Sequence, residues 1–535
     1  MKPTATEVAP SSTRPGLGRA AASVSAWNLV SRLTGFARVL AMGAALGATS
    51  LGDTYQAANL VSNVLFELLA GGMLSAVLVP TFVARLEAGD RDGARRLAGR
   101  LVGVGAAILG AVAVVGMVAA PAIMRVLTAA VESPAVRDRQ VEIGAFLLLF
   151  FLPQLVLYAA GAVATAVLHA DRRFAAAAAA APVANNVVVI ATMIAFGLLR
   201  DGDTDLHPST GQLLVLALGT TAGVLAMTAV PWLSLRASGD VVRPTWPGAE
   251  DRRELGVLGR SGLWAAGHLG ASQILVAVTV IVAGGVTGGV VAYQIAFTFF
   301  LLPHAVLANP VYTVLYPRLA SDAAEGRDVA FAGDLAAGLR TLAFVLLPAA
   351  AVLAAIADPL LQVLSIGALG AADALLVAGA LAAYSAGLLG YSSGFLLTRG
   401  SYALGDARTP TTVYATACAV GVVAMFVVGG GLDGRARLVA LGLVHAAVVT
   451  VAAVALLAHL RRRLHRPVPV AGGLARAAAS AVAAGAAAWA VVAALDAGSR
   501  AEAAAVCALA GAAAVAAFLA VAIPTRSLAS AEVNG

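Results

Sequence analysis

The chain has little charge for its length. Only 12% of its 535 residues are Asp, Glu, Lys or Arg, whereas 60% are hydrophobic, and the mean hydropathy is +0.89. A soluble globular protein of this size carries about twice that share of charged residues. The apolar residues form long unbroken runs, as membrane helices do, and not the short alternating segments of a β-barrel. The composition therefore predicts an all-α polytopic membrane protein.

Cysteine and histidine are also scarce. Cys418 and Cys507 each lie in an apolar segment with no nearby mate, which indicates small buried hydrophobes and not a disulfide framework. The seven histidines show no paired metal-ligand spacing, so we expect no metal site and no other cofactor. The sequence contains neither a nucleophile–base–acid set nor an ATP-binding motif. It therefore favours a protein that is not an enzyme and is not driven directly by ATP, with any coupling ion left open.

Fourteen apolar segments are long enough to cross a bilayer. They cover residues 24–47, 54–86, 100–128, 141–168, 179–199, 211–235, 258–284, 287–318, 340–366, 373–398, 409–430, 437–460, 473–495 and 501–523. The second and the eighth are longer than a bilayer requires, so we expect them to tilt or to extend into the cytosol.

The loops carry a strong bias in positive charge. With the N-terminus in the cytosol, the cytosolic segments hold 26 of the 35 Lys and Arg residues and the outside loops hold seven. Positive residues are retained on the cytosolic side of membrane proteins. The bias therefore predicts a multi-pass protein of the plasma membrane with both termini in the cytosol.

Two halves of the chain resemble each other. Tyr55-Gln56 matches Tyr293-Gln294 at an offset of 238 residues, and Tyr158 matches Tyr391 at an offset of 233. An offset of six helices keeps both copies in the same orientation, as in transporters whose substrate site lies between parallel repeats. The sequence therefore predicts two pseudo-symmetric six-helix lobes plus two C-terminal helices.

The predicted organisation follows from this duplication. We expect a disordered cytosolic N-terminus at 1–20, an N-lobe at 21–235, a cytosolic linker at 236–257, a C-lobe at 258–460, a basic cytosolic loop at 461–472, an appended helix pair at 473–523 and a cytosolic tail at 524–535.

Two arginines, Arg32 and Arg38, lie inside the first apolar segment. A charge at that depth is costly unless it faces a water-filled cavity or a partner, so such a residue suggests a functional site. Cations in a cavity suggest an anionic cargo. The alternative is a structural role in which helix carbonyls, or a carboxylate such as Asp53 or Glu67, satisfy the guanidinium groups. Glu67 itself could instead yield to a phosphate or bind a coupling ion.

Several motifs resemble those of the MviN/MurJ family, the lipid II flippases of the MOP exporter superfamily, and of its actinobacterial-type branch. Ser31–Arg38 resembles the family signature S-R-x-x-G-F-x-R. The supporting matches are Asp53 at the start of the second segment, the runs Glu67–Ser75 and Val79-Pro80, Ala181-Pro182 with Asn186, Ser272-Gln273, and the loop Tyr402–Pro410.

The resemblance implies a cargo and a set of binding residues. The cargo would be lipid II or a related polyprenyl-diphosphate glycan, moved from the inner to the outer leaflet by alternating access. The substrate-binding residues implied in this sequence are Ser31, Arg32, Arg38, Asp53, Glu67, Asn186 and Gln273. Membrane lipids and cell-wall synthesis proteins are the expected partners, with no nucleic acid, and the appended helix pair is expected to line a groove for the lipid tail.

This chain also departs from the family pattern. A cationic pair on the second helix aligns with Phe66 and Glu67, and an arginine on the eighth helix aligns with Thr298. The reduced positive charge leaves two alternatives open: an exporter of another polyprenyl-linked glycan, or a non-transporting paralogue that scaffolds cell-wall synthesis. A drug-like cation is disfavoured as cargo because the two arginines would repel it.

Overall fold

The computed structural model describes residues 16–68, 78–171, 173, 181–200, 205–239, 242–246, 248 and 270–533. Within these ranges the regular structure is helical, with no β-strand. Eleven of the described helices are long and apolar enough to cross a membrane, or up to twelve if one bent pair is counted as a single span. The predicted all-α membrane architecture is confirmed at this level. Residues 69–75 of the motif Glu67–Ser75 and most of the predicted linker lie outside the described residues. The histidine at position 268 also lies outside them.

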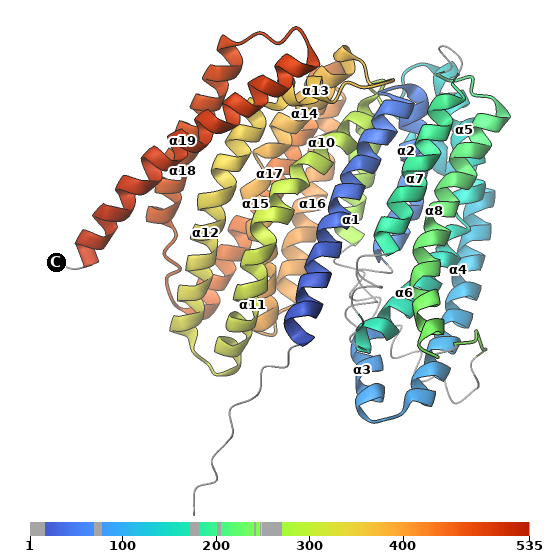
Figure 1. Cartoon of the computed structure of the whole chain (residues 1–535), viewed down its shortest axis with the longest axis horizontal. Coiled ribbons are helices and arrows are strands. Elements are labelled where there is room, and N and C mark those ends of the chain that lie inside the picture. The colour runs from blue at the N-terminus through green and yellow to red at the C-terminus, as the bar shows by residue number, and fades with distance from the viewer. Residues whose placement is uncertain are drawn as a thin grey trace, which may run out of the picture.

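The first half of the chain forms eight labelled helices (Figure 1). They are α1 (Gly16–Leu46), α2 (Ser50–Glu67), α3 (Val79–Glu87), α4 (Arg91–Leu127), α5 (Pro134–Phe151), α6 (Gln154–Ala170), α7 (Ala181–Leu198) and α8 (Thr210–Ala237). The helix α1 begins at Gly16, so residues 16–20 of the predicted disordered N-terminus are helical. Helix propagation is easier than nucleation, so the flanking residues extend the apolar helix.

The second half begins with the short helix Gly270–Ala283. It continues with α10 (Gly289–Pro303), the π-helix η3 (His304–Ala308), α11 (Asn309–Ala324), α12 (Asp328–Ala355), α13 (Ala357–Val363), α14 (Ala371–Ser385), α15 (Leu388–Ala403), α16 (Arg408–Gly429), α17 (Gly434–Leu464), α18 (Ala471–Ala494) and α19 (Arg500–Val533). Because α19 runs to Val533, it includes most of the predicted tail.

Each predicted segment contains at least one described helix, but several segments are broken. The eighth segment is interrupted after Pro303 by the π-helical turn η3, and the tenth bends by 46° between α14 and α15. Proline lacks the amide hydrogen of a helical bond, and π-turns relieve the resulting strain inside long helices. The eighth segment is thus one long helical run, Gly289–Ala324, that contains a π-turn.

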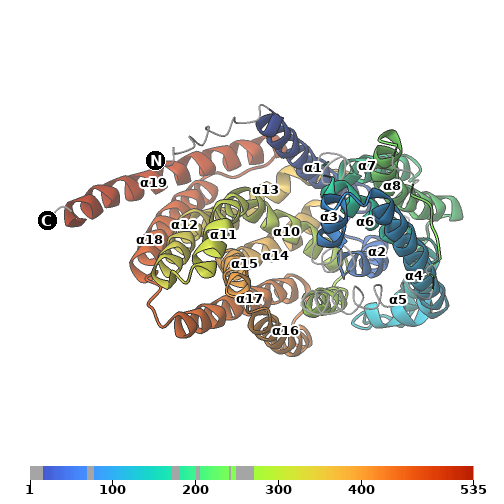
Figure 2. The same cartoon turned by 90° about the horizontal axis from the view of Figure 1, so that it is seen from below.

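The helices pack as two groups and a peripheral pair (Figures 1 and 2). In the first group α7 packs on α1 and α8, while α4 packs on α5 and α6. In the second group α17 packs on α14, α15 and α16, and α12 packs on α11 and α15. The groups meet where α10 contacts α1 and α2. At the periphery α18 packs on α12, and α19 packs on α18 and α13.

A described part of the predicted linker lies along α4. The amide of Thr245 donates to the carbonyl of Gly99 at 3.0 Å. A Cβ atom added at Gly99 would come within 2.2 Å of the Arg243 carbonyl oxygen, and one at Gly103 within 2.3 Å of the Thr245 carbonyl oxygen. Glycine is therefore required at both positions for the linker backbone to approach the helix this closely.

The loop motif around Asp406 connects the α15–α16 loop to α17. Its carboxylate accepts from the Thr409 amide at 3.0 Å and contacts His459 and Arg463 of α17 at 3.0 and 3.2 Å. Burial acts to raise the pKa of the Asp406 carboxyl, but the Thr409 and His459 hydrogen bonds outweigh it and hold that pKa below its usual value. The loop between α15 and α16 is thus tied to the end of α17.

The appended helices α18 and α19 bury a hydrophobic cluster that is separate from the main core. Ala484, Ala488, Ala510 and Ala514 of α18 and α19 form a small cluster of their own, apart from the main core that spans both helix groups. Removing the pair would expose one face of α12 to lipid. That face of α12 is apolar, so contact with lipid tails would cost it little free energy.

We therefore predict that truncation after residue 470 leaves the two helix groups folded. The shortened protein should elute from size-exclusion chromatography in detergent as a single species, with its helical circular dichroism per residue unchanged and its melting temperature lowered by a few degrees. Aggregation together with loss of helicity across the remaining chain would contradict this separation.

Candidate functional site

A polar cavity of about 230 Å³ lies at the junction of the two helix groups and contains Arg38. Its wall includes residues of α1, α2, α7, α10 and the helix Gly270–Ala283. The polar side chains that line it are Arg38, Gln56, Asn59, Asn63, Asn186 and Gln294. Arg38 is half-buried and is the only charged residue among the described residues that line this cavity.

A second cavity, of about 440 Å³, opens between α1 and α10 and contains Arg32. Its lining consists of Ser31, Arg32, Gly35, Phe36, Thr298, Leu301 and Leu302. Gly35 lines both cavities, so they adjoin each other on either side of this residue. Arg32 is exposed here, whereas Arg38 is more enclosed.

Neither arginine has a partner within the part of the chain that the structure describes. No ion pair or hydrogen bond joins Arg32 or Arg38 to a described side chain or carbonyl. The sequence left open whether Asp53 or Glu67 neutralises these arginines, and no such pair forms among the described residues. Two unpaired guanidinium groups therefore face cavities, which is the arrangement expected of an anion-binding site.

Asn186 positions the arginine-bearing helix. Its side-chain amide, on α7, donates to the Ser31 carbonyl at 3.3 Å and to the Thr34 hydroxyl at 3.1 Å. Asn186 also lines the Arg38 cavity. One residue thus joins α7 to α1 and contributes a polar group to the cavity wall.

Glu67 and Gln273 line neither of these two cavities. Glu67 is the exposed last residue of α2, and Gln273 lies half-buried on the helix Gly270–Ala283. Of the seven residues predicted to bind substrate, the structure brings together Ser31, Arg32, Arg38 and Asn186. Glu67, Gln273 and Asp53 line neither cavity, although Asp53 accepts a hydrogen bond from the amide of Val290 in the wall of the Arg38 cavity.

Asp53 lies in the contact between the two helix groups. Its carboxylate accepts from the amides of Gly288 at 2.7 Å, Val290 at 2.9 Å and Val291 at 3.0 Å, and the residue is only 3% exposed. These amides belong to the first turn of α10, whose unpaired donors and positive dipole end favour an anion. Asp53 of α2 therefore caps a helix of the other group.

The backbones of the two groups also approach closely around Asp53. Gly288 has φ of +77°, and a Cβ atom there would come within 2.3 Å of the Ala48 carbonyl oxygen. Nearby, the Ala368 amide donates to the Ala44 carbonyl at 2.8 Å. A side chain at position 288 would be strained and would also push the groups apart.

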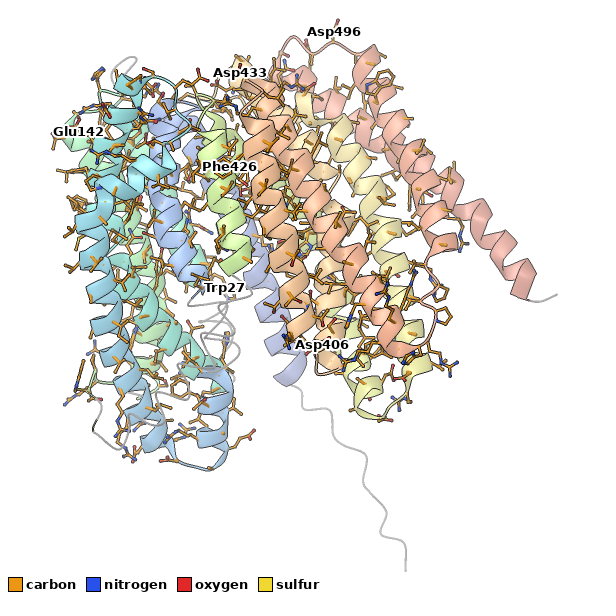
Figure 3. The ribbon with its side chains drawn as sticks, turned by 180° about the vertical axis from the view of Figure 1, so that it is seen from behind. Trp27, Glu142, Asp406, Phe426, Asp433 and Asp496 are labelled. Atoms are coloured by element: carbon orange, nitrogen blue, oxygen red, sulfur yellow. The ribbon has the colours of Figure 1, made fainter. Side chains whose placement is uncertain are left out.

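A further contact joins the groups at the same end. Buried Arg437 of α17 lies 3.9 Å from Glu132 of the α4–α5 loop and 3.0 Å from Asp433. Figure 3 places Asp433 at the end of the molecule opposite Asp406. The positive-inside rule predicts that the Asp433 end faces outward.

The sequence analysis missed part of the cavity lining. Gln56, Asn59 and Asn63 lie on α2 at spacings of three and four residues, which puts their side chains on one helix face. A row of polar side chains inside a predicted membrane helix indicates that this helix face lines a cavity, so the sequence contained a signal for these three residues. Arg399 directly follows the predicted segment 373–398, and the structure places it in the last turn and a half of α15.

Comparison with known proteins places this geometry in a family. A family model described as "Lipid II flippase MurJ" matches residues 42–507. A protein of Rhizobium tropici named "Probable lipid II flippase MurJ" is 29% identical over 402 residues, covering 74% of this chain and 73% of its own. The Burkholderia cenocepacia protein named "Lipid II flippase MurJ" is 24% identical over 415 residues, covering 74% and 75%.

Solved structures share the fold. One described as "Lipid II flippase MurJ, inward closed conformation" has a TM-score of 0.75 at 16% identity, covering 94% of this chain and 99% of its own. An inward-facing multidrug resistance MATE transporter of the MOP superfamily has a TM-score of 0.64 at 15% identity, covering 83% and 94%. The match of the family model over most of the sequence means that this chain belongs to the lipid II flippase MurJ family.

Proposed function

We propose that this protein flips lipid II from the inner to the outer leaflet by alternating access. The observation that carries the proposal is the unpaired Arg38 in a polar cavity at the junction of two helix groups. Lipid II contains a diphosphate, and arginine forms strong charge-assisted hydrogen bonds with phosphate oxygens. The adjoining Arg32 cavity opens between α1 and α10 and gives the headgroup a route into the site.

We also propose that fourteen helices form two pseudo-symmetric lobes and an appended pair. The twelve spans counted with the bent pair, together with the partly described segments 54–86 and 258–284, support that number. The offset of 238 residues relates Asp53 to Val291, and these two residues are hydrogen-bonded. Equivalent residues in contact are expected where a pseudo-two-fold axis passes between two repeats.

In this scheme Asp53 acts in the outer gate and does not bind substrate. Outward opening separates its carboxylate from three α10 amides, together with the backbone contacts at Ala44 and Ala48. Substrate bound at the arginines must supply enough free energy, through its preference for the open form, to offset these lost contacts.

The lipid tail has a matching apolar surface. A groove of about 460 Å³ lies between η3, α12 and the appended helices, and its lining includes Leu307, Phe344, Val352 and Phe518. It carries almost no polar groups, so an isoprenoid chain can lie in it while the headgroup occupies the cavities. This placement gives the appended pair a role in holding the tail.

The membrane potential can supply the driving force. A headgroup with about two negative charges gains roughly 4–5 kcal/mol per 100 mV on moving outward from an inside-negative cytosol. The empty arginine cavity is positive, so the same field favours its return inward. We place the protein in the plasma membrane with both termini in the cytosol, because this orientation puts most of the positive loop charges on the cytosolic side.

The first prediction concerns the outer gate. In Asp53→Asn the side-chain nitrogen cannot accept a hydrogen bond, so one α10 amide loses its acceptor and the open form gains population, by about tenfold. Spin labels on exposed cysteines at Ala135 and Leu432, with Cys418 and Cys507 replaced by serine, should show a larger fraction of long distances by double electron–electron resonance. The matched control Asp496→Asn, exposed at the same end, should leave the distances unchanged. Identical distributions in both variants would remove Asp53 from the gate.

The second prediction ranks the two arginines. Arg38→Ala should lower the rate of lipid II flipping in vesicles by about tenfold to a hundredfold, because an enclosed charge–phosphate contact is lost. Arg32→Ala should cost less, because water can take the place of this exposed side chain. Both variants should keep the melting temperature of the parent protein. Near-normal flipping by both would return the arginines to a structural role.

The third prediction tests the driving force and separates a transporter from a scaffold. In vesicles with ion gradients held constant, an inside-negative potential should raise the initial rate of lipid II flipping outward. Collapse of the potential should lower that rate. An unchanged rate would exclude this drive, and no flipping under any condition would favour the scaffolding alternative.

A further inference from the structure

Arg399 of α15 has no neutralising partner. Its guanidinium carbon lies 4.8 Å from the centre of the Tyr312 ring and 5.9 Å from that of Phe395. One of its terminal nitrogens is buried and makes no hydrogen bond, and no ion pair joins the residue to any described carboxylate. The ring faces offset part of the cost of burying this charge, but they leave its N–H donors unused.

The rings around Arg399 form a surface that we call the aromatic shelf, made of Tyr312, Tyr391 and Phe395. Tyr391 and Phe395 lie 5.1 Å apart, and Tyr312 stacks on Phe395 at 6.4 Å. Tyr391, Phe395 and Arg399 follow one another at intervals of four residues, so they share one face of α15. Phe395 is 38% exposed, so the shelf can be reached.

Hydrogen bonds and ring contacts of Ser392 and His304 hold the aromatic shelf in place. The Tyr312 hydroxyl donates to the Ser392 carbonyl at 2.7 Å, and the Ser392 hydroxyl is 2.9 Å from Nδ1 of His304. His304 opens the π-turn η3 and packs against Tyr391 at 4.9 Å. The polar groups behind the shelf are therefore satisfied by one another, whereas the guanidinium on its edge is not.

The shelf belongs to the same region as the arginine cavities. His304 lies within electrostatic reach of both Arg32 and Arg399. It is three residues beyond Leu301, which lines the Arg32 cavity, and so on the same side of that helix. The aromatic shelf and the Arg32 cavity therefore lie near each other, on the same side of this helix.

We propose that Arg399 binds a carboxylate of the peptide carried by the glycan headgroup, with the headgroup resting on the aromatic shelf. This inference rests on the proposed function. With its face on Tyr312, the guanidinium directs its donors along its own plane, which suits a planar carboxylate. The diphosphate, with about two negative charges, is matched by Arg32 and Arg38, and Arg399 supplies a single charge for a single carboxylate.

The test compares two lipids on full-length protein in nanodiscs. Lipid II carries diphosphate, glycan and peptide, whereas the polyprenyl diphosphate carries only the anion shared by both. Arg399→Gln should weaken binding of lipid II by about tenfold and leave binding of polyprenyl diphosphate unchanged. Arg32→Gln should weaken both. Arg399→Lys, which keeps the charge without the planar fork, should show a smaller loss for lipid II than Arg399→Gln.

Two controls separate a specific effect of Arg399 from a general loss of positive charge and from misfolding of the variant. Arg318→Gln, which removes an exposed arginine paired with Asp334 at 3.4 Å, should change neither affinity. Lipid II with amidated peptide carboxylates should bind the parent protein about as weakly as lipid II binds Arg399→Gln. This second control needs no variant, so it stands even if Arg399→Gln fails to fold.

Three results would overturn the inference: an equal loss for both lipids in Arg399→Gln, no loss for either, or equal binding of native and amidated lipid II by the parent protein. Failure of the proposed function has a different signature, because the parent protein would then bind neither lipid and flip none.

Discussion

The constraint on which this structure depends is the cost of an unpaired cation inside an apolar bilayer. A guanidinium group there must reach water, an aromatic face or an anion. Arg32 and Arg38 meet this requirement by facing cavities between two helix groups. The helix junction must therefore stay hydrated, although the same helices are otherwise apolar enough to pack without a gap. The cavity is the structural consequence of keeping these charges.

The two carboxylates of α2, Asp53 and Glu67, have different surroundings. Asp53 could have neutralised an arginine, but three α10 amides occupy its oxygens. Glu67 remains exposed at the end of α2 without a described cation beside it. The arginines thus keep their positive charge for an anionic ligand, and the contact between the groups is made by backbone amides. Such a contact is short and directional, so it has one well-defined closed geometry.

Two of the positions at which the sequence resemblance led us to expect cations, Phe66 and Thr298, are integrated into the packing. Phe66 packs on Tyr158 with ring centres 4.6 Å apart, and the Thr298 hydroxyl donates to the Gln294 carbonyl at 2.8 Å within its own helix. Neither position is left unsatisfied by the loss of a cation. A further cation lies on α15, where Arg399 packs on the aromatic shelf. Under the proposed function, three cations on α1 and α15 would share the contacts with the anionic headgroup.

The sequence by itself determined the membrane class, the apolar segments and the family, and it drew attention to Arg32 and Arg38, because hydropathy, motifs and cations within apolar runs are local properties of the chain. It did not determine which polar groups meet. Asp53 and Gly288 are 235 residues apart, and their hydrogen bond exists only because the two helix groups pack against each other there. Arg399 directly follows the predicted segment 373–398. Its place beside Tyr312 depends on how α15 packs against α11, which no local pattern encodes.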